Sequence, residues 1–165
     1  MKRFNQWLQV AGCALLLSLS ACKEQEAAAP VERPPVAVPT TEDRQAWGDY
    51  LNDVVTRNMQ GVRNQPYVYL IPFDSDPEFE GKYVAIKEKA GGDVARGIVA
   101  GNMLAYAGLN SSNVADLVVE AFDGVQPDTM KGVKLLFIGD AADSPRVQEA
   151  VAASGVEYVH IDTSR

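Results

Sequence analysis

The residues best placed to do chemistry in this 165-residue chain are aspartates that follow predicted strands. Three apolar segments, 67–71, 133–138 and 156–161, are predicted strands, and five aspartates stand just beyond them: Asp74, Asp76, Asp140, Asp143 and Asp162. Ligands of open parallel sheets bind outside the carboxyl ends of the strands. If these strands end at one edge, the carboxylates converge there, and oxygen ligands of this kind suit Mg²⁺ or Ca²⁺.

The same aspartates also suit a structural role. Aspartate hydrogen-bonds its own backbone in turns and caps helices, and its charge is stable in a wet loop. The segment 73–81, FDSDPEFEG, does not match the regular DxDxDG calcium loop. We therefore favour caps and turns, and keep a divalent-metal site or a carboxylate-lined ligand site as the alternative.

His160 is the only histidine, and it lies inside the predicted strand 156–161. Its side chain points opposite to those of Val159 and Ile161, since side chains alternate along a strand. A half-buried strand residue is the favoured interpretation, with a general base or a pH-sensitive contact as the alternative. One histidine and two cysteines are too few for a Cys/His zinc cluster, and no GxSxG elbow is present.

Phosphate-binding patterns are weak. The turn 139–144 lacks GxGxxG, and its two aspartates would repel a phosphate at the helix start. Gly91-Gly92-Asp93 lacks the lysine and hydroxyl residue of a P-loop. The net charge of −7 and the pI of about 4.7 remove the usual electrostatic source of nucleic-acid binding. No cofactor and no nucleic-acid partner are predicted.

The amino terminus reads as a secretory signal peptide, residues 1–21. Lys2 and Arg3 precede an apolar stretch, 7–19, that is too short to span a bilayer. It ends in Leu19-Ser20-Ala21-Cys22, which resembles the lipobox of bacterial lipoproteins.

That resemblance implies that the Cys22 sulfur receives a diacylglycerol, that the chain is cut after Ala21, and that Cys22 becomes a membrane anchor. Two or three acyl chains hold a protein on a membrane, where one chain holds it only marginally. By the same resemblance, Lys23 in place of an aspartate favours the outer membrane, on its periplasmic side. Cys13 is removed with the signal peptide, so no disulfide within the mature chain is possible.

Residues 22–39 are predicted to be a tether, because they hold four prolines and no large aromatic residue. A single domain, 40–165, follows it. An amphipathic helix is expected from Thr40 and Thr41, with Trp47 leading its apolar face and Gly61 beyond its end.

The middle of the chain is harder to interpret. The segment 76–90 fits either a strand or a helix, and we expect a strand at 83–87. Asp93 is expected to cap a helix that runs through Ala107, in which Gly97 and Gly101 permit a close approach. Ser112 is expected to cap the next helix, which ends at Gly124.

The last third predicts a right-handed βαβ unit, with strands at 133–138 and 156–161 and a helix from Ser144 between them. The fold class is therefore α/β: a Rossmann-like sandwich with a small, mainly parallel sheet of three to five strands and helices on both faces. The sequence suggests a lipid-anchored periplasmic accessory or binding protein whose partner is another envelope protein. A metal-assisted hydrolase or a small-ligand-binding domain is the alternative.

Overall fold

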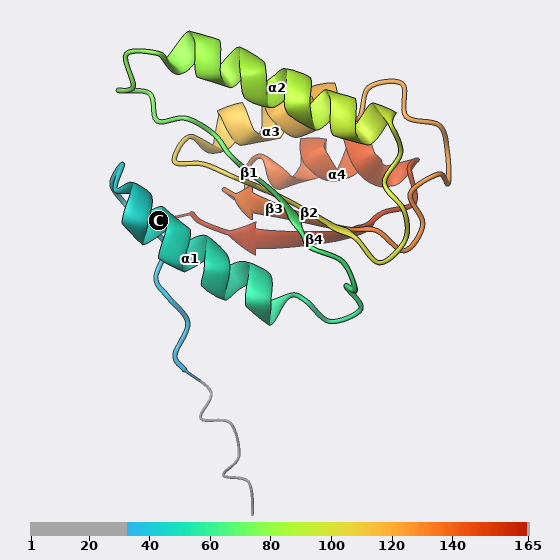
Figure 1. The fold of residues 1–165 in the computed structure, drawn as a ribbon, viewed down its shortest axis with the longest axis horizontal. Helices are drawn as coiled ribbons and strands as arrows, with labels where there is room; N and C mark the ends of the chain where they lie inside the picture. Colours follow the sequence, from blue (N-terminus) through green and yellow to red (C-terminus); the bar gives the residue numbers. More distant parts are fainter. Residues whose placement is uncertain (1–32, 165) are drawn as a thin grey trace, which may run out of the picture. The chain divides into compact units, whose positions relative to one another are not determined.

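The computed structural model describes residues 33–164 and contains a four-stranded, all-parallel sheet with four helices (Figure 1). The signal peptide, Cys22 and most of the tether lie outside the described residues. The elements, in chain order, are α1 (Arg44–Arg57), β1 (Tyr67–Leu70), α2 (Phe79–Ala95), β2 (Met103–Ala107), α3 (Ser111–Ala121), β3 (Lys134–Gly139), α4 (Ser144–Ala152) and β4 (Glu157–Asp162). The predicted α/β class and the parallel sheet are confirmed.

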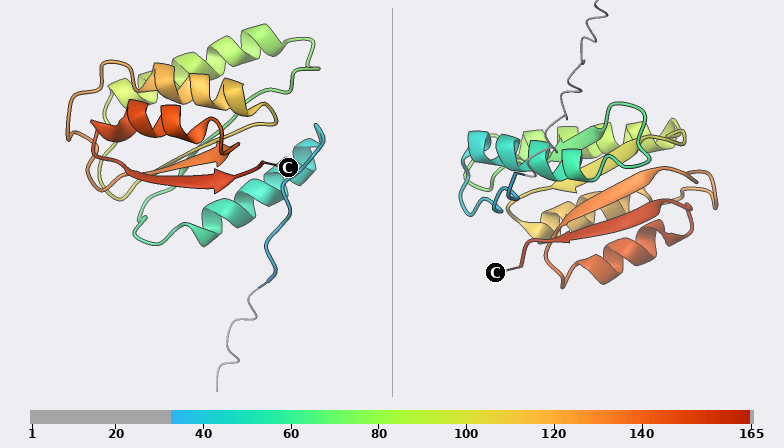
Figure 2. Two further views of the ribbon diagram at one scale, coloured as in Figure 1. Left: turned by 180° about the vertical axis from the view of Figure 1, so that it is seen from behind. Right: turned by 90° about the horizontal axis from the view of Figure 1, so that it is seen from below.

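The strands lie in the order β1-β2-β3-β4, so each crossover moves the chain one step in the same direction. Because such crossovers are right-handed, all three connecting helices fall on one face of the sheet. Figure 2 shows α2, α3 and α4 together on that face and α1 alone on the other. Helices thus cover both faces of the sheet, as predicted, and α1 alone covers one of them.

Alternating strand residues build a core on each side of the sheet. Toward α2, α3 and α4, the buried residues include Tyr69, Tyr106 and Phe137. Toward α1, they include Ala105 and Leu136. Both central strands are buried along their whole length, which explains why they read as continuous apolar runs.

Helix α1 forms as its apolar spacing predicts, with Trp47, Tyr50, Leu51 and Val54 buried against the sheet. Its cap is Asp43 rather than Thr40 or Thr41, because the Asp43 carboxylate accepts from the backbone N–H groups of the next turn. At its other end, Lys134 Nζ donates to the backbone oxygens of Asn58 (3.0 Å) and Gln60 (2.7 Å). A cation from β3 thereby satisfies carbonyls at the negative end of the helix.

The strand expected at 83–87 is wrong, because this segment lies inside α2. Phe79, Tyr83, Ile86, Ala90 and Val94 recur at helical spacing and pack together against the sheet. Burial of this shared apolar face stabilises the helix despite the β propensity of the individual residues. The helix therefore continues through Gly91 and Gly92.

The helix expected from Asp93 to Ala107 is also wrong. Asp93 lies near the end of α2, and Met103–Ala107 is the strand β2. The intervening Gly97 and Gly101 have φ of +88° and +85°, a backbone conformation that favours glycine and makes turns. They are turn residues here and do not form a close-packing helix face.

The predicted elements of the last third are all present, with β3 and β4 paired in parallel along six residues. Helix α3 starts two residues earlier than expected, because its cap is Asn110 rather than Ser112; the Asn110 side chain accepts from Asn113 N. The compact unit begins at Pro34 rather than Thr40. Pro39 is buried, and the Val36 N–H donates to Asp53 Oδ2 at 3.1 Å, so the last residues assigned to the tether pack on the domain.

Candidate functional site

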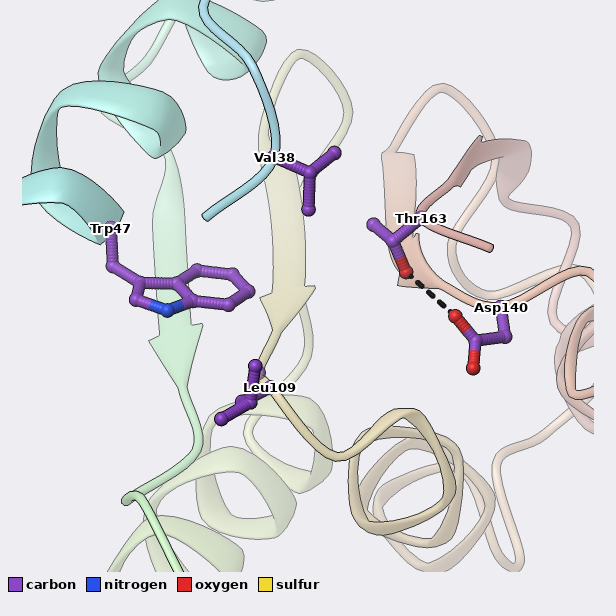
Figure 3. A pocket seen from close by; sticks show the side chains of 6 residues that line it. Val38, Trp47, Leu109, Asp140 and Thr163 are labelled. Atoms are coloured by element: carbon purple, nitrogen blue, oxygen red, sulfur yellow. Dashed lines mark hydrogen bonds between the residues drawn. The ribbon is translucent and has the colours of Figure 1, made fainter. Parts of the chain in front are cut away.

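A cavity of about 270 Å³ opens at the carboxyl edge of the sheet, where the sequence placed the candidate site (Figure 3). It is lined by residues from the start of the folded unit, from α1 and from the segments that follow β2, β3 and β4: Val38, Trp47, Gly108, Leu109, Asp140 and Thr163. Of the six residues proposed from the sequence, Asp140 alone is among them.

The lining of this cavity is mixed, and apolar side chains form one part of it. The Trp47 ring comes from α1, and its Nε1 donates to the backbone oxygen of Thr41 at 3.0 Å, which fixes the indole. Val38 comes from the segment before the helix, and Leu109 stands at the turn after β2 with 36% of its surface exposed. These three side chains form the apolar part of the lining.

Asp140 and Thr163 form the polar side of the cavity. The Thr163 hydroxyl donates to Asp140 Oδ1 at 3.1 Å, as the dashed line in Figure 3 shows. The Thr163 N–H donates to the Gly139 oxygen at 3.1 Å, which holds the end of the chain over β3. The exposed carboxylate can therefore accept from an N–H group of a ligand at the rim.

Asp143 has a structural role. Its carboxylate accepts from the Ser111 hydroxyl at 2.6 Å and from Arg146 Nε at 3.1 Å. The same Ser111 hydroxyl accepts from the Asp140 N–H at 2.8 Å. This network ties the turn after β3 to the start of α3. It leaves no room for a side chain at Gly139, whose Cβ would stand 2.8 Å from Ser111 Oγ.

The remaining aspartates lie in separate turns. Asp74 accepts weakly, from Asn110 and Asn113 at 3.4 and 3.5 Å. Asp76 pairs with Lys82 at 2.8 Å and with Arg44 at 3.1 Å, and the Lys82 hydrogen bond is the main cause of its lowered pKa.

Asp162 accepts from the hydroxyl and the N–H of Ser164, and these hydrogen bonds lower the pKa of its carboxyl. Within residues 33–164, no three acidic, histidine or cysteine side chains are grouped so that they could hold a metal ion. The aspartates are thus distributed over separate turns and caps in the part of the chain that the structure describes.

His160 is half-buried in β4 and points toward the face covered by α4. Its ring stacks on Phe137 with centroids 5.6 Å apart, and Nε2 lies 2.8 Å from the Gly139 oxygen. A neutral ring with a proton on Nε2 donates to that carbonyl, so the geometry gives His160 a packing role in the strand.

Sequence reasoning missed the buried carboxylate of Asp93, which joins α2 to β1. The residue is 5% exposed, and it accepts from the Tyr69 hydroxyl and from Lys89 Nζ, both at 2.7 Å. Arg96 also donates to it. Burial alone raises the pKa of Asp93, but the hydrogen bonds from Lys89 and Tyr69 outweigh burial and hold the pKa below its ordinary value. Lys89 and Arg96 stand four residues before and three residues after Asp93. This spacing indicates ion pairs on one helix, once the helix is taken to continue through Gly92.

Tyr106 stacks on Tyr69 with ring centroids 4.8 Å apart, and burial raises the pKa of both phenols. The Tyr106 hydroxyl is buried and has no hydrogen-bond partner among residues 33–164. The two rings fill the space between the sheet and α2, next to Asp93.

A second cavity, of about 490 Å³, lies where α2 and α3 end. Val94, Ala121 and Val125 give it apolar walls, and Glu120 and Asp123 stand among its lining residues. Because crossover helices run against the direction of the strands, this cavity is on the amino side of the sheet, away from the predicted site. Gly91, whose Cβ would meet nothing within 4 Å, also lines it.

The chain matches no protein-family model, no curated protein and no solved structure at a significant level. Among the helices of residues 33–164, none is long and apolar enough to cross a membrane.

Proposed function

We propose that this chain is a lipid-anchored accessory or binding protein of the bacterial envelope, held on the periplasmic side of the outer membrane. The observation that carries the proposal is the run Leu19-Ser20-Ala21-Cys22, placed directly after a basic start and a short apolar stretch. Acylation of Cys22 with two or three chains would hold the protein on the membrane, because each buried methylene contributes about 0.8 kcal/mol.

The cavity at the carboxyl edge supports a protein partner. Its volume of about 270 Å³ is below the range of about 300–1,000 Å³ that is usual for small-molecule sites. Its mixed lining suits a peptide segment: Trp47 and Leu109 can contact an apolar side chain, and Asp140 can accept from an N–H group beside it. Val38, in the last part of the predicted tether, lines this cavity, so the proposed binding site lies beside the point where the anchor segment joins the domain.

A divalent-metal-assisted activity is the weaker alternative. Asp143 already accepts from Ser111 and Arg146, and Asp162 accepts from Ser164. Within the described residues, the candidate ligands do not gather into a group that could hold a metal. The geometry therefore favours a binding role over hydrolysis at these carboxylates.

Metabolic labelling with a clickable palmitate analogue tests the anchor. We expect label in the unmodified chain and in Cys13→Ala, and none in Cys22→Ala, since the resemblance assigns acylation to Cys22. The two variants remove the same side chain, so Cys13→Ala controls for effects on export. Label that persists in Cys22→Ala, or its absence from the unmodified chain, contradicts the proposal.

Site-specific photocross-linking in cells tests the partner. A photoreactive residue at Leu109, on the rim of the cavity, is expected to give an adduct with an envelope protein. The matched control is Val99, which is 69% exposed and lies in the turn after α2. Equal adducts from both positions, or none from Leu109, would argue against a partner at the carboxyl edge.

A further inference from the structure

The sheet has two outer strands, β1 and β4, and β4 is the one with an accessible backbone edge. Glu157 N donates to Val133 O at 2.8 Å, and Thr163 N donates to Gly139 O at 3.1 Å. Because backbone groups alternate along a strand, the residues at 157, 159, 161 and 163 face β3. The N–H and C=O groups of Tyr158, His160 and Asp162 therefore point outward, and no strand among the described residues pairs with them.

The outer edge of β1 is blocked. The Ile71 N–H donates to Ala107 O, so residues 67, 69 and 71 face β2, and the even-numbered positions face outward. Pro66 and Pro72 occupy two of these outward positions, on either side of a strand of four residues. Proline offers no N–H to an incoming strand and limits pairing at an edge. The six-residue strand β4 contains no proline.

The charges on β4 select the strand that can pair with it. Glu157 and Asp162 stand at its two ends, and the Glu157 side chain is 65% exposed. They are five residues apart and so lie on opposite faces of the sheet. Glu157 lies 3.6 Å from Lys134 Nζ and Asp162 accepts from Ser164, and two cations five residues apart on a neighbouring strand add an ion pair at each end in either direction.

The middle of β4 offers apolar contact. Val159 and Ile161 point toward the face of α1 and are only partly covered, and they pack at the margin of that core. The right-hand view of Figure 2, seen from below, shows α1 on the side of β1, away from β4. A neighbouring strand with an apolar residue beside Val159 and another beside Ile161 would extend the core on the α1 side by one strand.

We propose that the β4 edge, formed by Tyr158, His160 and Asp162, binds an extended segment of a partner protein as a fifth strand. The segment has about six residues, apolar side chains at alternate positions, and Lys or Arg at both ends. This inference rests on the proposed partner-binding role and specifies the chemistry of the partner.

A synthetic peptide provides the probe. Acetyl-Lys-Thr-Val-Thr-Val-Lys-amide places its valines beside Val159 and Ile161 in parallel pairing, and Lys-Val-Thr-Val-Thr-Lys does so in antiparallel pairing. Binding to the isotope-labelled full chain is measured from amide chemical shifts and hydrogen exchange. One of the two peptides is expected to slow exchange at Tyr158 and His160 by 10-fold or more at saturation. The same peptide with Glu at both ends is expected to bind at least 5-fold more weakly.

Two sets of variants separate edge pairing from non-specific charge attraction. His160→Pro removes an outward N–H without touching a bond to β3, and it should abolish binding. His160→Ala, which loses the same ring contacts, should bind like the unmodified chain. Glu157→Gln with Asp162→Asn should weaken binding about 2- to 10-fold at low salt.

The inference is overturned by equal binding of the Glu-ended peptide, by equal binding to His160→Pro and His160→Ala, by shifts centred away from β4, or by no binding at millimolar peptide. A dimer formed through β4 would overturn it as well. None of these outcomes depends on acylation, so failure here is distinct from failure of the palmitate labelling.

Discussion

Replacement of Asp93 by asparagine is expected to destabilise the domain in a pH-dependent way. The carboxylate is 5% exposed and accepts from Tyr69, Lys89 and Arg96. A hydrogen bond to a buried charged group is worth about 1.5–3 kcal/mol, against about 1 kcal/mol for a neutral acceptor. The two cationic side chains are largely exposed, at 62% and 73%, so each ion pair adds only about 0.2–1 kcal/mol. The sum predicts a loss of about 2 kcal/mol at neutral pH.

The pH dependence follows from the lowered pKa of Asp93. In the unfolded chain the carboxyl titrates near pH 3.9, and in the folded chain it titrates lower. The folded state therefore gains stability above about pH 4, and this gain is lost as the pH falls through the folded pKa. Asparagine does not titrate. The difference in free energy of unfolding between the unmodified chain and Asp93→Asn should therefore narrow as the solution is acidified below about pH 4.

Urea denaturation of both chains at several pH values, from neutral to about pH 3, measures this difference in free energy of unfolding. At neutral pH the midpoint of Asp93→Asn should fall by about 1 M urea, for a slope of about 2 kcal/mol per molar. Asp128→Asn is the control, because Asp128 pairs only with Lys131 on the surface and its φ of 63° suits asparagine equally well. A loss below about 0.5 kcal/mol, or a difference that stays constant on acidification, would refute the role assigned to Asp93.

Two further substitutions test how the two ends of strand β3 are held. Lys134→Met should cost about 1–3 kcal/mol in urea denaturation, because it removes the cation that binds two backbone oxygens at the end of α1, whereas the exposed Lys131→Met should change stability by less than about 0.5 kcal/mol. Gly139→Ala should cost about 1–3 kcal/mol, since its Cβ meets Phe137 and Ser111, whereas Gly91→Ala, in open space inside α2, should stabilise the chain by about 0.5–1 kcal/mol. Equal changes in stability for the two lysine variants, or for the two glycine variants, would contradict the packing described.

The fold class could be predicted because its signals are local. The segment 133–161 carries an apolar strand, a Ser-Pro helix start, a glycine stop and a second strand, and each signal acts within a few residues. The parallel orientation of the two strands also follows, since a helical crossover of this length joins parallel strands. These rules needed no knowledge of which residues touch across the sheet.

The segment 76–107 could not be assigned from local signals because its structure depends on tertiary packing. Gly91 and Gly92 normally weaken a helix, and Tyr83 to Ile86 favours a strand. The decisive fact is that Tyr83, Ile86, Ala90 and Val94 meet one buried surface of the sheet, which the sequence does not display. Once α2 is extended past Gly92, Met103–Ala107 must be the strand.

The sequence predicted a site at the carboxyl edge, and a cavity lies there, but its lining differs from the predicted residues for a topological reason. A crevice at the carboxyl edge of an open sheet forms where the strand order reverses and neighbouring loops diverge to opposite faces. The order β1-β2-β3-β4 has no reversal, so the crossover loops all turn toward the same face. Each aspartate then pairs with the element beside it, as Asp143 does with Ser111 and Arg146.

The cavity that exists at this edge comes instead from α1 and from the segment that leads into it. Trp47 and Val38 lie on the face without crossover helices, and they meet Leu109, Asp140 and Thr163 across the strand ends. A single helix on that face leaves β4 less covered than the central strands, which are wholly buried. The one-directional strand order thus accounts for both proposed binding surfaces, because it places three helices on one face and leaves the other to α1 alone.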